Sequence, residues 1–192
     1  MTIFQLLMLG ASAYFAFKIY EHIQTLKEPE QRDETKRTSE AFSTFDSSSL
    51  IQKADEEMQK GDLQKALAIY SEVNIKEPNS AETLFKMGYT LSLQNRDDEA
   101  LEYYKDALKL DKNNTYIYQA MASLYRKQKE YERARMHLES SLAIDDRNPI
   151  TYYNYGNLLT DMKEFDEAKK MYKKAIELDS DFKEAKEELS KL

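Results

Sequence analysis

The chain contains no cysteine and only two histidines among its 192 residues. The absence of cysteine excludes disulfide bonds, thiolate metal sites and a cysteine nucleophile, and it leaves the redox compartment open. The histidines, His22 and His137, have no carboxylates at metal-ligand spacing. Sequence alone leaves a distant Ser-His-Asp arrangement open, but the chain lacks a nucleophile elbow and a glycine-rich phosphate loop. We therefore predict no enzymatic activity, no catalytic residues, no cofactor and no metal site.

Turn-forming residues and an excess of basic charge are also lacking. The chain has 4 glycines and 3 prolines, whereas Lys, Glu, Leu, Ala and Tyr are abundant. This composition favours helices over hairpins. There are 28 Lys and Arg against 35 Asp and Glu, a formal net charge of -7. Because nucleic-acid binding needs a basic surface to neutralise phosphates, we predict no nucleic-acid partner.

One long apolar run is present, from residue 3 to residue 20, and only three polar side chains interrupt it. About 20 apolar residues in a helix cross the hydrocarbon core of a bilayer. We therefore predict a transmembrane anchor helix at residues 1–20. A cleavable signal peptide and a buried helix of the soluble part are the alternatives. Small residues at Ala11 and Ala13 fit a cleavage site, but no Lys or Arg precedes the run and the chain stays apolar after it.

Basic residues follow the apolar run and none precedes it. They are Lys18, Lys27, Arg32, Lys36 and Arg37. By the positive-inside rule the C-terminal part of the chain stays in the cytoplasm. We predict a single-pass protein of a bacterial inner membrane facing the cytoplasm, and the alternative is a C-terminal part in the periplasm. Residues 21–46 are polar and mixed in charge, which predicts a linker.

From Ser47 onward the sequence repeats without a gap, with a period of 34 residues. The four units are residues 47–80, 81–114, 115–148 and 149–182. Position 20 of each unit is alanine: Ala66, Ala100, Ala134 and Ala168. Position 8 is always small: Ala54, Gly88, Ala122 and Gly156. Position 24 is always large: Tyr70, Tyr104, Leu138 and Tyr172.

This pattern resembles the tetratricopeptide repeat over about 136 of the 192 residues. The resemblance implies an all-α fold, an α-solenoid of four tandem helix-turn-helix repeats. We expect a C-terminal capping helix at residues 183–192, and the hydrophobic helix at the N-terminus would precede the repeats. Each pair of helices would leave an apolar face that only the next pair covers. Departures from the family pattern include Leu50 and Leu84 in place of the first aromatic residue.

The turns and the ends of the array have their own signals. The expected turns between paired helices are at Gly61, Asn95, Lys129 and Lys163, and glycine suits a left-handed helix cap best. In the first repeat, Lys53 and Glu57 occupy positions that are apolar elsewhere. We expect both to face solvent on a first helix that has no preceding neighbour.

The resemblance also implies a binding surface, because positions 2, 5, 9, 12 and 13 line a concave groove in this family. That groove holds an extended peptide or a partner helix. The candidate groove residues are Phe85, Tyr89, Tyr116, Gln119, Ser123, Arg126, Lys127, Tyr153 and Asn157. Rigid aromatic rings combined with amides and hydroxyls suit peptide binding. The alternatives are that the rings pack against neighbouring helices and that Arg126 and Lys127 are ordinary solvated charges.

One specialised use of the family grips the terminal carboxylate of a chaperone tail with a lysine at position 5. That position holds Ile51, Phe85, Gln119 and Tyr153, so we do not predict chaperone-tail binding. We expect a non-enzymatic, membrane-anchored scaffold that binds a protein or peptide ligand. The alternatives are a structural subunit of a larger membrane complex and an extracytoplasmic assembly or secretion factor. The sequence predicts no oligomeric state.

Overall fold

The structure, a computed structural model, describes residues 46–192. The predicted anchor helix at residues 1–20 lies outside the described residues, as does the predicted linker except for Asp46. Both therefore stay predictions. Of the helices within residues 46–192, none combines the length and apolar character that crossing a bilayer requires.

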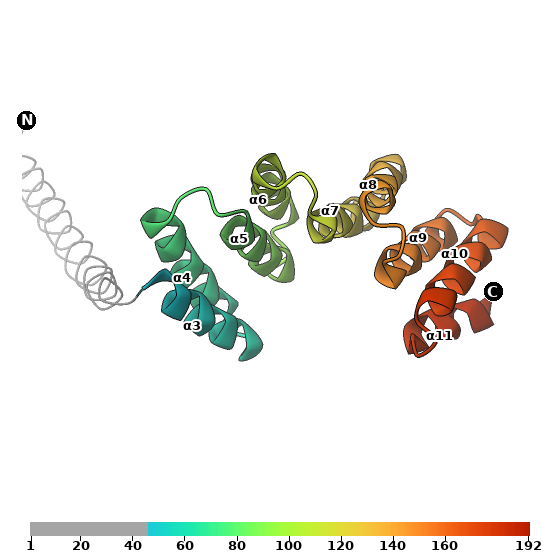
Figure 1. Cartoon of the computed structure of the whole chain (residues 1–192), viewed down its shortest axis with the longest axis horizontal. Coiled ribbons are helices and arrows are strands. Elements are labelled where there is room, and N and C mark those ends of the chain that lie inside the picture. Colours follow the sequence, from blue (N-terminus) through green and yellow to red (C-terminus); the bar gives the residue numbers. More distant parts are fainter. Residues whose placement is uncertain (1–45) are drawn as a thin grey trace, which may run out of the picture. The chain divides into compact units, whose positions relative to one another are not determined.

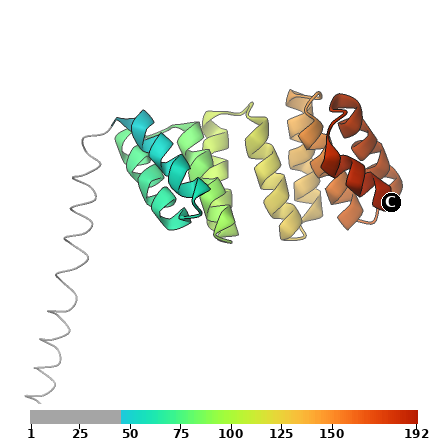
Figure 2. The same cartoon turned by 90° about the horizontal axis from the view of Figure 1, so that it is seen from below.

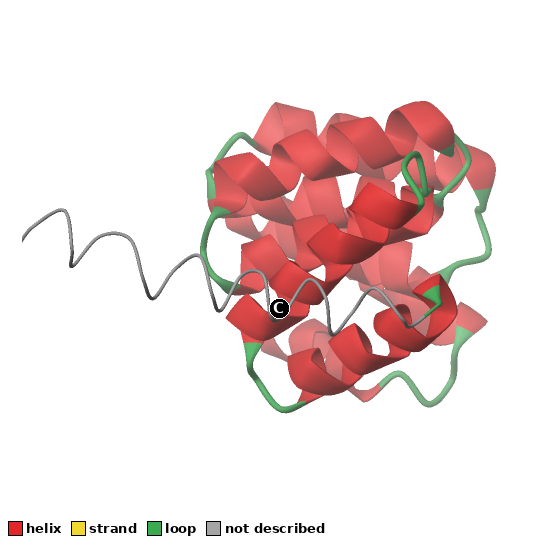
Figure 3. Ribbon diagram, turned by 90° about the vertical axis from the view of Figure 1, so that its left-hand side faces the viewer, coloured by secondary structure: helices red, strands yellow, loops and turns green. Residues whose placement is uncertain are grey.

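The described part of the chain is a succession of helices without a strand (Figures 1 and 3). The helices are α3 (Ser47–Gln59), α4 (Leu63–Lys76), α5 (Ala81–Leu93), α6 (Asp97–Leu110), α7 (Thr115–Lys127), α8 (Tyr131–Ile144), α9 (Pro149–Asp161), α10 (Phe165–Leu178) and α11 (Lys183–Lys191). Helices α5 to α10 each begin 34 residues after their counterpart in the preceding pair. The predicted all-α repeat solenoid is confirmed. Below, repeats 1 to 4 are the pairs α3–α4, α5–α6, α7–α8 and α9–α10.

Side-chain caps determine where the first helix of each later repeat begins. Ser80, Asn114 and Asn148 directly precede α5, α7 and α9, and each accepts a backbone N–H bond from the first turn. The oxygen-to-nitrogen distances are 3.2, 3.1 and 3.0 Å. These bonds satisfy donors that the helix itself leaves unpaired.

A residue with a left-handed backbone conformation follows the first helix of each repeat. The φ angles of Gly61, Asn95, Lys129 and Lys163 are 83°, 59°, 62° and 64°. In each turn the next residue donates its N–H to a carbonyl five residues back, as Arg96 does to Leu91 at 3.0 Å. This is the pattern of a Schellman motif, and it reverses the chain so that the second helix packs on the first. The turns therefore lie at the residues that the sequence predicts.

The small residues at position 8 make room for the large ones at position 24. A Cβ atom on Gly88 would lie 2.7 Å from Cε1 of Tyr104, and one on Gly156 would lie 2.5 Å from Cε1 of Tyr172. Both rings are buried, and glycine is the residue that admits them. Repeat 3 instead pairs Ala122 with Leu138, both of which are buried.

The helices stack in sequential order, as the row in Figure 2 shows. Each second helix packs on the first helix of the next repeat: α4 on α5, α6 on α7 and α8 on α9. The first helices also contact one another, α5 with α7 and α7 with α9, so they form one continuous layer. Helix α11 packs on α10 and buries Ala185, as expected of a capping helix.

The expectation that Glu57 faces solvent is wrong. Glu57 is buried at the end of α3, with Lys60 Nζ at 3.0 Å and Lys65 Nζ at 3.1 Å from its carboxylate oxygens. Two cations therefore compensate the burial of this charge, and the hydrogen bonds from Lys60 and Lys65 lower the pKa of Glu57.

Candidate binding groove

A depression crosses the layer of first helices between repeats 3 and 4. Its inner part is a cavity of about 60 Å³ lined by Ala122, Ser123, Arg126, Leu138, Asn154, Asn157 and Leu158. Its outer part is an open recess of about 520 Å³ lined by Ser123, Arg126, Lys127, Lys129, Tyr131 and Asp161. Ser123 and Arg126 line both parts, so the two are adjacent. Four of the predicted groove residues, Ser123, Arg126, Lys127 and Asn157, thus come together here.

The inner cavity presents polar groups with unused hydrogen-bonding capacity. Asn157 Oδ1 accepts a hydrogen bond from the Tyr172 hydroxyl at 2.8 Å, which leaves the Nδ2 amino group of Asn157 as its free end. Within residues 46–192 the Ser123 hydroxyl and the Asn154 amide have no hydrogen-bond partner. Both residues keep some exposure to solvent, so water satisfies them in the free protein. A ligand can replace that water with its own backbone or side-chain atoms.

Both predicted cations of the groove form bridges between repeats. Arg126 Nε lies 3.3 Å from Asp161 Oδ2 at the end of α9. Lys127 Nζ lies 2.8 Å from Asp97 Oδ2 and 3.0 Å from Asn95 Oδ1, at the turn that joins α5 to α6. Partly exposed ion pairs of this kind contribute less than about 1 kcal/mol, so a ligand carboxylate can compete for either cation.

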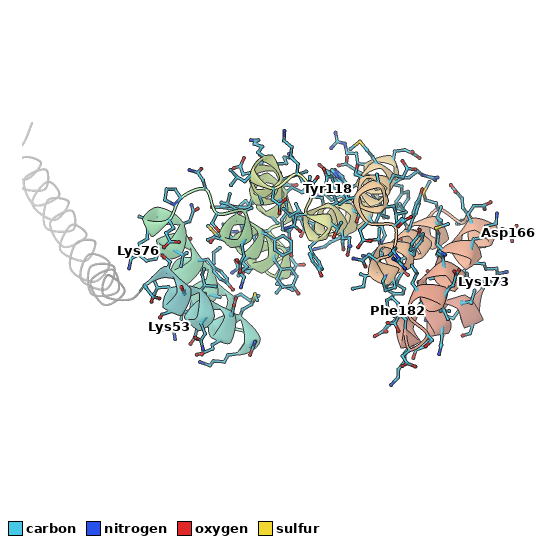
Figure 4. All side chains as sticks on the ribbon, viewed as in Figure 1. Lys53, Lys76, Tyr118, Asp166, Lys173 and Phe182 are labelled. Atoms are coloured by element: carbon cyan, nitrogen blue, oxygen red, sulfur yellow. The ribbon has the colours of Figure 1, made fainter. Side chains whose placement is uncertain are left out.

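The four predicted aromatic residues divide into two pairs. Tyr89 is 43 % exposed and Tyr116 is 61 % exposed. Phe85 is half-buried, and its ring centroid lies 5.6 Å from that of Tyr104. The Tyr153 ring is half-buried too, 5.0 Å from Phe182 and 6.1 Å from Tyr172. Figure 4 labels Phe182, which caps α11. Phe85 and Tyr153 therefore pack against neighbouring helices.

The rings do not form a continuous track. Phe85 and Tyr89 have centroids 6.5 Å apart and belong to the same helix. In the described part of the chain, no ring contact joins Tyr116 to Phe85, Tyr89 or Tyr153. Tyr89 and Tyr116 are separate exposed aromatic surfaces on α5 and α7.

Gln119 does not lie on the open surface where the sequence pattern places it. Its side chain is 7 % exposed, and Nε2 donates to Thr151 Oγ1 at 2.8 Å. Thr151 Oγ1 in turn lies 3.2 Å from Ser141 Oγ. This buried network joins α7, α8 and α9, so Gln119 holds repeats 3 and 4 together, because buried polar groups require partners.

Four residues of the cavity were not among the sequence candidates for the groove: Ala122, Leu138, Asn154 and Leu158. Asn154 lies at position 6 of its repeat, one helical turn before Asn157, and Leu138 lies at position 24. The available signal was the break at position 24, where three repeats have tyrosine and repeat 3 has leucine. The sequence analysis grouped the four residues at position 24 as large, and this grouping concealed the difference between leucine and tyrosine.

His137 and the carboxylates form no site of their own. The His137 ring is buried and stacks on Tyr125 with centroids 5.3 Å apart, and it also contacts Tyr118, which Figure 4 labels. Burial, assisted by the positive charge of Arg133, lowers the pKa of His137. Among residues 46–192 no three His, Cys, Asp or Glu side chains converge in a metal-like group.

Several known proteins resemble this chain. MamA is 28 % identical with a TM-score of 0.63, and the match covers 71 % of this chain and 80 % of that one. PilF of Pseudomonas aeruginosa is 22 % identical with a TM-score of 0.70, covering 76 % of this chain and 66 % of that one. The first TPR of Spaghetti (RPAP3), bound to the HSP90 peptide SRMEEVD, is 27 % identical with a TM-score of 0.55, covering 58 % and 88 %.

A search of curated protein sequences gave no match. The profile of the family described as Tetratricopeptide repeat matches residues 61–113 and 114–181, more than half of the chain. This fold is generally a non-enzymatic scaffold for protein interactions. From the profile match and the four stacked pairs of helices, we conclude that the chain belongs to the tetratricopeptide repeat family.

Proposed function

We propose that the protein is a non-enzymatic, membrane-anchored interaction scaffold that binds a peptide or helix of a partner protein along α5, α7 and α9. The observation that carries this proposal is the pair of adjacent hollows beside α7 and α9, where Ser123, Asn154 and Asn157 keep unused hydrogen-bonding groups. Such groups are suited to the backbone amides of an extended peptide, which otherwise lose their water on binding.

The exposed tyrosines would supply the apolar part of the interaction. Tyr89 and Tyr116 lie on neighbouring helices of the same layer and leave much of their rings exposed. Aromatic side chains give large contact areas with few rotatable bonds, and they dominate the binding energy of many interfaces. A bound segment would therefore contact rings on α5 and α7 and polar groups on α7 and α9.

The partner differs in kind from a chaperone tail. The relative that binds the HSP90 peptide supports peptide binding by this fold. In this chain, however, position 5 holds Gln119 in a buried network and the packed rings of Phe85 and Tyr153. No lysine stands there to hold a terminal carboxylate. The peptide SRMEEVD is therefore a suitable negative control.

Membrane attachment is part of the same proposal. The apolar run at residues 1–20 would anchor the chain, and residues 21–46 would act as the linker. The repeats would then face the cytoplasm. A compartment-sensitive reporter fused after Leu192 tests the orientation. Export of the reporter would overturn it and favour the extracytoplasmic assembly or secretion factor.

The binding proposal is tested by crosslinking followed by pull-down from membranes. The double variant Tyr89→Ala/Tyr116→Ala should lose the captured partner, because it removes the exposed aromatic area of the groove. A matched control is Ile75→Ala/Met136→Ala, which removes residues that are 74 % and 54 % exposed on α4 and α8. Retention of the partner by the groove variant would refute groove binding.

The alternative function, a structural subunit of a larger membrane complex, also has an observation in its favour. The second helices expose apolar residues outside the groove layer: Ile75, Leu110, Met136 and Ile144. Under this alternative the control variant loses its partner and the tyrosine variant keeps it. The same pair of variants therefore separates the two functions.

A further inference from the structure

The cavity between repeats 3 and 4 arises from a single break in the repeat pattern. In repeats 2 and 4 a tyrosine at position 24 fits against a glycine at position 8. Repeat 3 has Leu138 and Ala122 at these positions. Leucine lacks the phenol ring, and both Leu138 and Ala122 line the cavity.

The surroundings of the Tyr172 hydroxyl in repeat 4 show which space is left unfilled in repeat 3. The Tyr172 hydroxyl lies 2.8 Å from Asn157 Oδ1 at position 9 and 3.1 Å from Thr160 Oγ1 at position 12. In repeat 3 the same two positions are Ser123 and Arg126, and both line the cavity. The space that a phenol fills in repeat 4 is therefore open in repeat 3.

The polar lining of the cavity includes several hydrogen-bond donors. Asn157 offers its Nδ2 group because Oδ1 already accepts from Tyr172. The Ser123 hydroxyl, the Asn154 amide and the Arg126 guanidinium complete the set. No carboxylate lines this inner part, and Asp161 borders only the outer recess. Arg126 is the one charged residue of this lining, and it pairs with Asp161 of the outer recess.

We propose that this cavity is the specificity subsite of the groove and takes one acidic side chain, Asp or Glu, of a bound peptide. The inference rests on the proposed function, since it requires a peptide in the groove. The volume of about 60 Å³ suits a carboxylate on a short stem. An aromatic ring does not fit, because an engineered cavity that takes benzene measures about 150 Å³. In the free protein Asp161 pairs with Arg126 from outside, and the ligand carboxylate competes with it.

The decisive variant refills the cavity from inside. Ala122→Gly/Leu138→Tyr copies the glycine and tyrosine pair of repeats 2 and 4 into repeat 3 and leaves the polar lining residues unchanged. Leu138→Met is the matched control, because it conserves volume and adds no ring. Far-UV circular dichroism and thermal unfolding of each variant show whether the repeats remain folded.

A library of short random peptides displayed on phage supplies the ligands, with the purified full-length chain as the bait. We expect enriched peptides to share one Asp or Glu. Replacing that residue by Asn or Gln should weaken binding about tenfold, as expected for a charge-assisted hydrogen bond. Ala122→Gly/Leu138→Tyr should weaken the acidic peptide similarly and leave the Asn or Gln peptide unaffected, whereas Leu138→Met should change neither.

Substitutions of Arg126 and Asp161 should change the affinity for the acidic peptide in opposite directions. Arg126→Gln should weaken binding of the acidic peptide, whereas Asp161→Asn should strengthen it by removing the internal competitor. Enriched peptides without a shared acidic residue, or equal binding to the filled and open variants, would overturn the subsite. Such peptides would still support the proposed function if Tyr89→Ala/Tyr116→Ala abolishes their binding. If neither the cavity variants nor Tyr89→Ala/Tyr116→Ala change peptide binding, or if no peptide is enriched, both the subsite and the proposed function are wrong.

Discussion

The junction of repeats 1 and 2 and the junction of repeats 3 and 4 use the same repeat positions for opposite purposes. At the first junction Lys86 Nζ lies 2.8 and 2.7 Å from the two Asp55 carboxylate oxygens, and the buried Tyr70 hydroxyl donates to Asp55 as well. Lys86 Nζ also lies 6.0 Å from the centre of the Tyr70 ring. These three groups satisfy one another's charges and hydrogen bonds, so we call the junction of repeats 1 and 2 the closed junction. The junction of repeats 3 and 4 is the open junction.

At the second junction the same positions hold Ser123, Asn154 and Leu138. They make no ion pair and leave a cavity of about 60 Å³ between α7 and α9. The backbone arrangement is shared, but the partners that would fill the space are absent. Under the proposed function, binding capacity is set locally, by which repeat leaves its polar groups without internal partners.

The largest expected effect comes from opening the closed junction. Tyr70→Leu gives repeat 1 the residue that repeat 3 has at position 24. It removes a fully buried ring and a hydrogen bond to Asp55, and it should lower the free energy of unfolding by about 2–3 kcal/mol. Urea unfolding followed by circular dichroism measures the change. Leu138→Met is the control and should stay within about 1 kcal/mol of wild type. An unchanged midpoint for Tyr70→Leu would show that the first junction is not closed by packing.

A smaller effect is expected from the buried network that supports the open junction. Gln119→Ala should lower the free energy of unfolding by about 1–2 kcal/mol, because Thr151 loses a buried hydrogen-bond donor at 2.8 Å. Ser123→Ala, on the same helix but exposed and without a protein partner, should change stability by less than about 0.5 kcal/mol. If the two variants unfold at the same urea concentration, Gln119 does not hold the junction.

Repeat 3 also contains His137, the single histidine of residues 46–192. We expect this residue to make the stability of the folded repeats depend on pH. Burial first, and Arg133 second, lower the folded-state pKa of His137 below its ordinary value of 6.5. The unfolded chain therefore binds the proton more tightly. The contribution to stability is complete above pH 6.5 and is lost as the pH falls from there through the folded pKa.

Thermal unfolding at neutral and mildly acidic pH tests this dependence. His137→Phe keeps a ring against Tyr125 and removes the titrating group, so the difference between the two conditions should shrink. An identical pH dependence in the variant and the wild type would assign the effect to other groups.

The smallest expected effects lie in the turns, where repeats 1 and 4 have different residues at the left-handed position. The turn of repeat 1 has Gly61 at φ 83°, whereas the turn of repeat 4 has Lys163 at φ 64°. A side chain in the left-handed region costs about 1 kcal/mol. Lys163→Gly should therefore raise the unfolding temperature slightly, and Gly61→Ala should lower it. Shifts of the same sign would show that backbone strain does not distinguish the turns.

Local patterns were sufficient to predict the helices. The recurring small and large positions and the turn residues Gly61, Asn95, Lys129 and Lys163 depend on residue type and spacing, which are visible in the sequence. The caps at Ser80, Asn114 and Asn148 were found only in the structure. The stripe that carries the candidate groove could be predicted for the same reason.

Whether each residue on that stripe is buried or exposed could be learned only from the tertiary structure. Gln119 and Tyr116 lie on the same helix, yet one is buried in a hydrogen-bond network and the other is exposed. The difference depends on Thr151 and on the neighbouring helix, which lies more than thirty residues away in the chain. The ion pair of Asp55 with Lys86 is a similar contact between repeats.

The sequence by itself thus determined that this protein is a stack of paired helices, because short-range periodicity selects helices and their phase. Only the tertiary structure decided where the stack is closed and where it is open. The reason is that a cavity is a balance of volumes contributed by several helices. At Leu138 that balance depends on Ala122, Ser123 and Asn154 together, and no single position reveals it.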